Sequence, residues 1–194
     1  MRLQLEQRYH QQNLQSFEAG QAINLPDREV WVVCRGVVTL STSYDNGEES
    51  LLGLVGPSGI FGSPLSEIYP YHASALSAVD LLGLSMAELE HTPLLCQDLF
   101  RSLNHRLQQS EKLLAIVGQR RVEDRLRQFL QLLGQEVGQN QGDQIRLTVR
   151  LTHQHLANAL GTTRVTVTRL LGQLRQEGVL DFDTDRHLLL SLRA

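Results

Sequence analysis

Short alternations of apolar and polar residues, separated by turn-forming residues, run through the first half of the chain. The segment at 31–41, WVVCRGVVTLS, is rich in β-branched residues, as strands are. The segment at 44–49, YDNGEE, contains an Asn-Gly pair, the strongest short-range signal for a hairpin turn. Strand and turn patterns continue through SLLGLV and GPSGIFG. This spacing predicts a small β-roll, of jelly-roll or barrel type, over residues 1–92.

The period of the pattern changes at Pro93. One row of positions, apolar except for a serine, then recurs at alternating steps of three and four: Phe100, Leu103, Leu107, Ser110, Leu114 and Val117. The row predicts a long helix over 93–118 with a seam along one side. The seam could pack only on the β-roll of its own chain, or part of it could pair with the same helix of a second copy. We favour the second interpretation, in which the helix forms a homodimer.

A hinge is predicted at residues 118–121, ahead of a second domain over 119–194. The first helix of this domain has an apolar face and an arginine, formed by Arg125, Leu126, Phe129, Leu130, Leu132 and Leu133. The next helix is expected to begin at Thr152, whose hydroxyl can cap the first turn. Gly161 can adopt the positive φ that ends this helix, and Thr162 or Thr163 can cap the following one. The pattern is that of a helix-turn-helix.

The helix that starts at Thr163 has two different faces. Val167, Leu170, Leu171 and Leu174 fall within one apolar arc, whereas Arg164, Val165, Thr168 and Arg169 share the opposite face with Gly172. A face with arginines and threonines and without acidic side chains suits the major groove of DNA, where guanidinium groups pair with guanine edges. The alternative is an ordinary amphipathic helix with a solvated basic face. The segment VLDFDTDRHLLLSL, bent at 183–185, then predicts a short hairpin wing.

The formal net charge of −3 becomes informative when the chain is divided. Residues 1–118 carry 7 basic and 13 acidic side chains, whereas residues 119–194 carry 11 basic and 8 acidic ones, so the balances are −6 and +3. The positive charge therefore lies where DNA contact is expected, and binding should weaken with salt. No apolar run approaches the length of a membrane span, and the first residues have no secretory or lipidation signal. We expect a cytoplasmic protein with no membrane association.

Other chemistry is not expected. Cys34 and Cys96 are interpreted as buried small apolar residues rather than a disulfide or an iron-sulfur site. The Asp181, Asp183, Asp185 series lacks the glycine and glutamate of a calcium loop, and His153 and His155 point in different directions at a helix start. Neither suggests a metal site, and no cofactor is expected. No arrangement of catalytic residues stands out, so the chain is not predicted to be an enzyme.

The segment GTTRVTVTRLLGQLRQEG at 161–178 resembles the DNA-binding domain of the cAMP-receptor/FNR superfamily of bacterial transcription regulators, and it is especially similar to the cyanobacterial nitrogen regulator NtcA and its relatives. A weaker resemblance extends over nearly the whole chain. It implies that Arg164 and Arg169 read base edges, and that Val165 makes an apolar contact where other members carry glutamate. It also implies phosphate contacts for Gln154, Thr162 and Thr166, and half-sites of the GTA and TAC type.

Cyclic-nucleotide-binding relatives use a glutamate for the ribose and an arginine for the phosphate. Ser63 stands where that glutamate is expected, and no arginine occurs between Arg35 and Arg101, so we predict that cAMP is not the ligand. The resemblance implies that nitrogen regulators bind 2-oxoglutarate with two arginines. In this chain Tyr69 stands at the position of the first arginine, and Arg120 matches the second. The effector is therefore unknown. A pocket for it would be lined by Phe61, Gly62, Tyr69, Tyr71, Ser110 and Arg120, and the alternative is that the aromatic residues pack in the core.

These patterns together predict an α+β protein with an N-terminal β-roll like a cyclic-nucleotide-binding domain, a long dimerisation helix and a C-terminal winged helix-turn-helix. The expected function is sequence-specific binding of double-stranded DNA by a homodimer at a palindromic site, to regulate transcription. The alternative is a small-molecule sensor or protein-interaction module with a degenerate DNA-binding domain, and salt-dependent duplex binding separates the two. Activation would also need a surface that contacts RNA polymerase. The residues indicate neither the target genes nor whether the protein activates or represses transcription.

Overall fold

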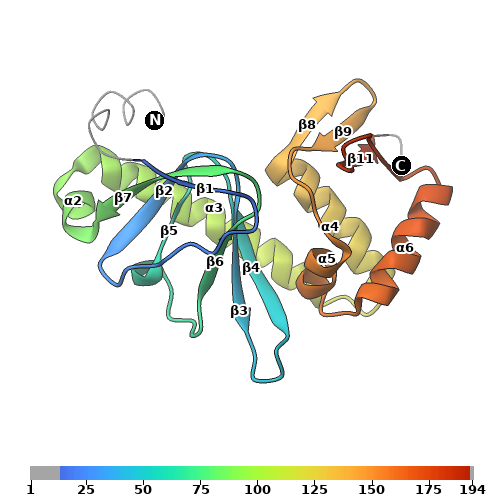
Figure 1. Cartoon of the computed structure of the whole chain (residues 1–194), viewed down its shortest axis with the longest axis horizontal. Coiled ribbons are helices and arrows are strands. Elements are labelled where there is room, and N and C mark those ends of the chain that lie inside the picture. Colours follow the sequence, from blue (N-terminus) through green and yellow to red (C-terminus); the bar gives the residue numbers. More distant parts are fainter. Residues whose placement is uncertain (1–13, 193–194) are drawn as a thin grey trace. The chain divides into compact units, whose positions relative to one another are not determined.

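The chain divides into two structural units. A computed structural model describes residues 14–192 (Figure 1). The first unit comprises the residues up to Ser43 together with Leu52–Ser110, and the second comprises Tyr44–Leu51 together with the residues from Glu111 onward. The division into 1–92, 93–118 and 119–194 remains a prediction.

The first unit contains two antiparallel sheets. One sheet has the strand order β1-β7-β2-β5 and the other has the order β4-β3-β6. Between β5 and β6 lies a short 3-10 helix, η1 (Ser63–Leu65). The strands are β1 (Gln15–Phe17), β2 (Glu29–Arg35), β3 (Val38–Ser43), β4 (Glu49–Val55), β5 (Ile60–Phe61), β6 (His72–Ala75) and β7 (Val79–Ser85).

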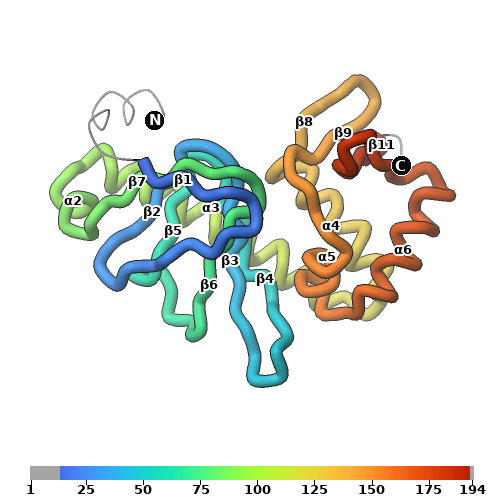
Figure 2. The backbone as a smooth tube through the Cα atoms, in the orientation of Figure 1, coloured from blue at the N-terminus to red at the C-terminus, as the bar shows by residue number. Residues whose placement is uncertain are grey.

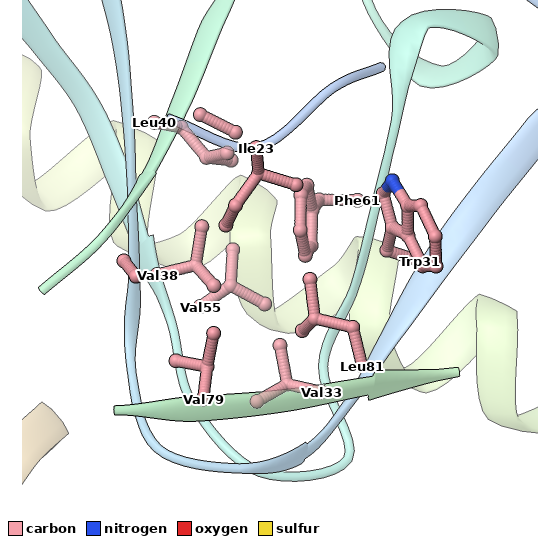
Figure 3. Close-up of a cluster of buried hydrophobic side chains, with 11 residues drawn as sticks. Ile23, Trp31, Val33, Val38, Leu40, Val55, Phe61, Val79 and Leu81 are labelled. Carbon is pink, nitrogen blue, oxygen red and sulfur yellow. The ribbon is translucent and has the colours of Figure 1, made fainter. Parts of the chain in front are cut away.

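Apolar side chains from both sheets meet in one cluster (Figure 3). Trp31, Val33 and Leu81 come from the first sheet, and Val38 and Leu40 come from the second. The other face of the first sheet carries a separate cluster, which includes Val30, Val32, Ile60, Leu82, Leu84, Leu89 and Leu95. Because alternate residues of β2 enter different clusters, both faces of this sheet are buried. The β-roll prediction is confirmed.

Glycines mark the turns of the β-roll. The Asn46-Gly47 pair joins β3 to β4, with Gly47 at φ +80° and its N–H donated to the Tyr44 carbonyl (2.9 Å). Gly36 separates β2 from β3 at φ +83°, and a Cβ atom there would lie 2.2 Å from the Ala78 carbonyl oxygen. Only glycine fits this approach without a shift of the backbone.

Two helices follow the β-roll. The short helix α2 (Met86–His91), which the sequence patterns did not suggest, begins with a capping box between Ser85 and Glu88. The long helix α3 (Pro93–Val117) has the predicted extent. The prediction of two buried cysteines is wrong, because Cys96 is exposed on α3 and donates its Sγ hydrogen to the Leu89 carbonyl (2.9 Å), whereas Cys34 is partly buried. At this position of α3 the thiol lies beside a carbonyl group of α2. It therefore has a hydrogen-bond partner and is not enclosed by apolar side chains.

Among the described residues, three helices and two hairpins make up the second unit, together with the end of α3 and residues 44–51. They are α4 (Val122–Val137), β8 (Gly138–Gln141), β9 (Gln144–Leu147), α5 (His153–Leu160), α6 (Arg164–Gln176), β10 (Leu180–Phe182) and β11 (Leu188–Ser191). The strands form one sheet in the order β10-β11-β9-β8. The backbone passes from α5 into α6 through a tight link, as Figure 2 shows. The predicted α+β class, with β-roll, long helix and winged helix-turn-helix, is confirmed.

Candidate nucleic-acid interface

Local hydrogen bonds fix the start of α5 and the link to α6. Thr152 caps α5, since its Oγ1 accepts the His155 N–H (3.0 Å) and its own N–H donates to His155 Nδ1 (3.4 Å). Gly161 ends α5 in the left-handed conformation, at φ +59°. The Thr163 hydroxyl then accepts the Thr166 N–H (3.2 Å) and caps α6. These caps confirm the predicted helix-turn-helix boundaries.

Helix α6 presents the predicted polar face to solvent. Its opposite side is buried at four positions, Val167, Leu170, Leu171 and Leu174, none of which is more than 3% exposed. The outward side carries Arg164, Val165, Thr168 and Arg169, all exposed, and Val165 is 79% exposed. A single exposed apolar side chain is common on protein surfaces, so the two arginines beside Val165 are what make this face a candidate for binding.

The arginines of the second unit divide into paired and free groups. Arg146 pairs with Asp183 (2.6 Å), and Arg175 pairs with Asp181 (2.8 Å). Arg127 pairs with Glu123 and with Glu177, and the hydrogen bond from Arg127 holds the pKa of Glu177 below its ordinary value. Within 14–192, by contrast, the guanidinium groups of Arg164 and Arg169 make no ion pair or hydrogen bond. The exposed face of α6 therefore carries uncompensated positive charge.

The residues implied to hold phosphates lie near helix starts. Gln154 is exposed in the first turn of α5, and its amide nitrogen donates to Asn158 Oδ1 (2.6 Å). Thr162 precedes the α6 cap, and Thr166 lies in the first turn of α6, with its hydroxyl 3.0 Å from that of Thr163. Free backbone N–H groups and the helix dipole make such starts favourable places for anions. Their contacts with DNA remain a prediction.

A side-chain hydrogen bond links the two helices. His153 Nδ1 lies 2.7 Å from Thr168 Oγ1, on the outward face of α6. His155, two residues along, is exposed, yet partial desolvation of its imidazole by neighbouring groups lowers the pKa below the ordinary value, although the Glu49 carboxylate acts in the opposite direction. Both histidines therefore have structural partners within the protein.

The wing forms between β10 and β11. Its turn is closed by hydrogen bonds from the Asp183 N–H to the His187 carbonyl and from the Arg186 N–H to the Asp183 carbonyl, each 3.0 Å long. Asp181 and Asp183 are occupied by their ion pairs with arginines. Asp181 and Asp183 thus serve the turn and its charge balance. No group of three or more potential metal-binding side chains occurs among residues 14–192.

The residues expected to line an effector pocket lie in different environments. Phe61 is fully buried in the core cluster of the β-roll, with Gly62 directly after it and Tyr71 partly buried against the same cluster. Tyr69 is 95% exposed. Ser110 and Arg120 are both exposed. Core packing is thus confirmed for Phe61, and Tyr69 is directed to solvent.

A buried polar pair in the first unit consists of Tyr71, one of the expected pocket residues, and Arg106, which was not expected there. Tyr71 Oη and Arg106 Nη1 are buried, and neither atom has a hydrogen-bond partner within the described residues. Burial raises the pKa of the Tyr71 hydroxyl, and the adjacent Arg106 side chain partly offsets this effect, through its charge and through a side-chain interaction with the hydroxyl. The spacing of the sequence does indicate the position of Arg106. It follows Ser102 by four residues and precedes Gln109 by three, so the three side chains share the inner face of α3.

The seam residues of α3 are all exposed in the single chain. Phe100 and Leu114 are each 72% exposed and Leu107 is 59% exposed, and Leu103, Ser110 and Val117 are also exposed. The opposite face carries the buried side chains of Ser102, Gln109, Leu113 and Ile116. The interpretation in which the seam packs only on its own β-roll is therefore wrong. A row of large exposed apolar side chains along one helix is the surface that a partner helix covers.

This combination of a β-roll, a long helix and a helix-turn-helix with a free basic face defines a winged-helix DNA-binding regulator. Comparisons with known proteins agree. Residues 124–194 match the model of the Crp-like helix-turn-helix domain. The chain is 38% identical to regulatory protein CysR of Synechococcus elongatus over 152 residues, 77% of this chain and 70% of that protein. It is 33% identical to the global nitrogen regulator of a Nostoc species over 180 residues, 86% of this chain and 80% of that protein.

The fold is also found among solved structures. A transcriptional regulator of the CRP/FNR family from Thermus thermophilus superposes with a TM-score of 0.74 at 27% sequence identity, covering 93% of this chain and 95% of that one. The chain belongs to the CRP/FNR family of bacterial transcription regulators. It is therefore a DNA-binding transcription regulator, and the family is not one of enzymes. None of the helices within 14–192 has the length and apolar character needed to cross a membrane.

Proposed function

We propose that two copies of this chain bind one palindromic DNA site and that each copy reads a half-site with α6. The observation that carries the proposal is the exposed face of α6, where Arg164 and Arg169 have no partner among residues 14–192 while Arg127, Arg146 and Arg175 are paired. Such a face has the donors that match base edges in the major groove. The site of action is the bacterial cytoplasm, where the genomic DNA lies.

The base contacts follow from the chemistry of each side chain. Arg164 and Arg169 donate to guanine or to neighbouring base edges, and Val165 contacts a thymine methyl group. Because an apolar side chain cannot accept a hydrogen bond from cytosine, Val165 selects a different base from a glutamate at this position. Half-sites of the GTA and TAC type are the resulting expectation.

Phosphate contacts position the reading helix. Gln154, Thr162 and Thr166 donate to the DNA backbone near the starts of α5 and α6. These neutral contacts carry little sequence information, whereas the arginines that neutralise phosphates release counterions when they bind. Binding to any duplex therefore weakens as salt is raised, while the choice between duplexes depends on α6.

In this proposal the exposed seam of α3 is the interface of a twofold-symmetric dimer. Pairing of Phe100, Leu103, Leu107, Ser110, Leu114 and Val117 with the same row in a second copy buries the large apolar side chains that water covers in the single chain. Twofold symmetry then places two α6 helices about one DNA turn, roughly 34 Å, apart. In this proposal residues 93–118 are the dimerisation helix, between a β-roll at 1–92 and a DNA-binding domain at 119–194.

The experiment that tests this function is selection of bound duplexes from a random library by the purified full chain. The expected product is an enriched motif with twofold symmetry and GTA and TAC half-sites. An unsymmetrical motif would contradict the dimer, and no enrichment would favour the alternative of a sensor or interaction module with a degenerate DNA-binding domain. Repeating the selection in the presence of cell metabolites tests for an effector.

An anionic effector is supported by a separate observation in the β-roll. Tyr71 Oη and Arg106 Nη1 are buried without hydrogen-bond partners among the described residues, which is costly unless a ligand or water satisfies them. We propose that a small carboxylate binds there, accepting hydrogen bonds from both groups. A cyclic nucleotide is not expected, because the segment between Arg35 and Arg101 offers its phosphate no arginine.

Thermal unfolding with a panel of mono- and dicarboxylates tests the effector site. The expected result is a raised Tm with at least one carboxylate, lost in Arg106→Met and kept in Arg101→Met, which changes an exposed arginine of the same helix that pairs with Asp98. A shift that survives Arg106→Met would contradict this site.

A further inference from the structure

Within the described residues, the side chain of Arg125, in the first turn of α4, donates to backbone carbonyls alone. Its Nε donates to the Gln119 carbonyl (2.8 Å) and its Nη1 donates to the Leu160 carbonyl (3.0 Å). The side chain is partly buried. One guanidinium group therefore holds two backbone positions that are 41 residues apart in the sequence.

Each acceptor lies at a point where the chain changes direction. Gln119 belongs to the link between α3 and α4, and Leu160 is the last residue of α5, directly before the left-handed Gly161. The last carbonyls of a helix have no partners within the helix, and a cation beside them is favourable. The bond from Arg125 thus ties the start of the helix-turn-helix link to the segment that enters α4.

This arginine differs from its neighbours in the type of partner. Arg127, Arg146 and Arg175 pair with carboxylates, whereas within 14–192 Arg125 has no carboxylate partner. An ion pair balances charge, but two bonds to carbonyl oxygens fix backbone geometry. The planar guanidinium group can make both bonds from one rigid plane, and an ammonium group on a flexible chain cannot reproduce that geometry.

We propose that Arg125 is a positioning residue for DNA reading. It holds the α5–α6 link at one position relative to the 118–121 segment, so that α6 presents Arg164 and Arg169 at one angle. A change in that segment then reaches α6 through this side chain as well as through the packing of α4 against α5. The inference rests on the proposed reading of DNA by α6, and it assigns no contact with DNA to Arg125 itself.

The test uses Arg125→Lys, which keeps the charge and loses the rigid pair of bonds. The matched control is Arg175→Lys, the same change at an exposed pair with Asp181. For each full-length protein, the affinities for the selected duplex and for a scrambled one are measured at several salt concentrations. Wild type must first discriminate between the duplexes, and if it does not, the proposed function fails before the role of Arg125 is tested.

The expected result for Arg125→Lys is a roughly tenfold loss of discrimination, about the effect of one misplaced base contact, with unchanged affinity for the scrambled duplex and an unchanged salt slope. The control should discriminate as wild type does. A lower Tm with normal discrimination would reduce Arg125 to a stabilising residue and overturn the proposal. A smaller salt slope would also overturn it, because Arg125 would then contact phosphate directly.

A second measurement covers the case in which Arg125→Lys folds poorly. Arg125→Gln retains one amide donor, and hydrogen exchange reports on the Thr162 N–H, which donates to the Ala157 carbonyl (3.1 Å) in the turn. Faster exchange at Thr162, with core amides of α4 unchanged, supports the proposal. Equal exchange in the turn and the core contradicts it, because the loss would then be global.

Discussion

His153 of α5 and Thr168 of α6 are joined by a hydrogen bond of 2.7 Å between Nδ1 and Oγ1. The Thr168 hydroxyl also donates to the Arg164 carbonyl at 2.9 Å, which uses its one proton. The imidazole must therefore donate, so Nδ1 carries a hydrogen. The bond fixes the outward face of α6 from a neighbouring helix, beside the arginine expected to read bases.

Removing either partner should destabilise the second unit. His153→Ala and Thr168→Val are each expected to lower the free energy of unfolding by about 1 kcal/mol, since each breaks the same hydrogen bond. Urea unfolding of the single and double variants gives the coupling energy. The double variant should be little worse than either single one, and additive losses would show that the bond contributes nothing.

Acidification should destabilise the second unit through His155. Partial desolvation places the folded-state pKa of this imidazole below its ordinary value of 6.5, so the unfolded chain binds more protons. The stabilising contribution is present above about pH 6.5 and is lost as the pH falls through the folded-state pKa. The Thr152 N–H also loses its acceptor when Nδ1 is protonated.

Unfolding followed from pH 7.5 to pH 5 measures this effect. The matched variant is His155→Gln, because glutamine can complete a capping box without titrating. The variant should lose less stability than wild type over this range. Equal losses in the two proteins would exclude His155 as the titrating group.

Gln109 should be essential to the attachment of α3 to the β-roll. Its amide accepts the Leu54 N–H (2.7 Å) and donates to the Leu54 carbonyl (3.2 Å), and the side chain is 4% exposed. Gln109→Leu leaves both groups of β4 buried without these partners, so we expect a loss of about 2–4 kcal/mol. The control is Gln108→Leu, at an exposed position of the same helix. Thermal unfolding distinguishes them, and similar Tm values would contradict this role.

The seam of α3 should control the oligomeric state. Leu107→Glu and Leu114→Glu put like charges into the proposed helix pair while changing side chains that are exposed in the single chain. Sedimentation should show a dimer for wild type and a monomer for these variants, with folding retained. Asn104→Glu, at another exposed position of α3, serves as the control. A variant dimer as tight as that of wild type would place the interface elsewhere.

The elements with strong periodicity could be predicted from the sequence. The two faces of α6 follow from the spacing of Val167, Leu170 and Leu174, and the caps at Thr152 and Thr163 follow from hydroxyl chemistry at helix starts. The β8–β9 hairpin could not be predicted, because its first strand reads GQNQ and has no apolar alternation. Its register depends on pairing with β9, and β9 in turn pairs with β11.

The candidate effector site was harder to predict from the sequence, for a different reason. An arginine in the middle of a long helix usually lies in solvent, and only the packing of the inner face of α3 shows that Arg106 has a buried nitrogen beside Tyr71. Tyr69, which the resemblance placed at a ligand position, is instead almost fully exposed. Ligand positions depend on three-dimensional packing more than helix faces do.

Duplex discrimination by Arg164→Ala tests the central claim most directly. Titrations of the selected and the scrambled duplex at one salt concentration are compared for wild type, Arg164→Ala and Arg175→Ala, a change on the same helix at an arginine paired with Asp181. Arg164→Ala should lose about 1–3 kcal/mol of discrimination, as expected for one bidentate base contact, while Arg175→Ala keeps it. If Arg164→Ala discriminates as well as wild type does, α6 does not read DNA through this residue.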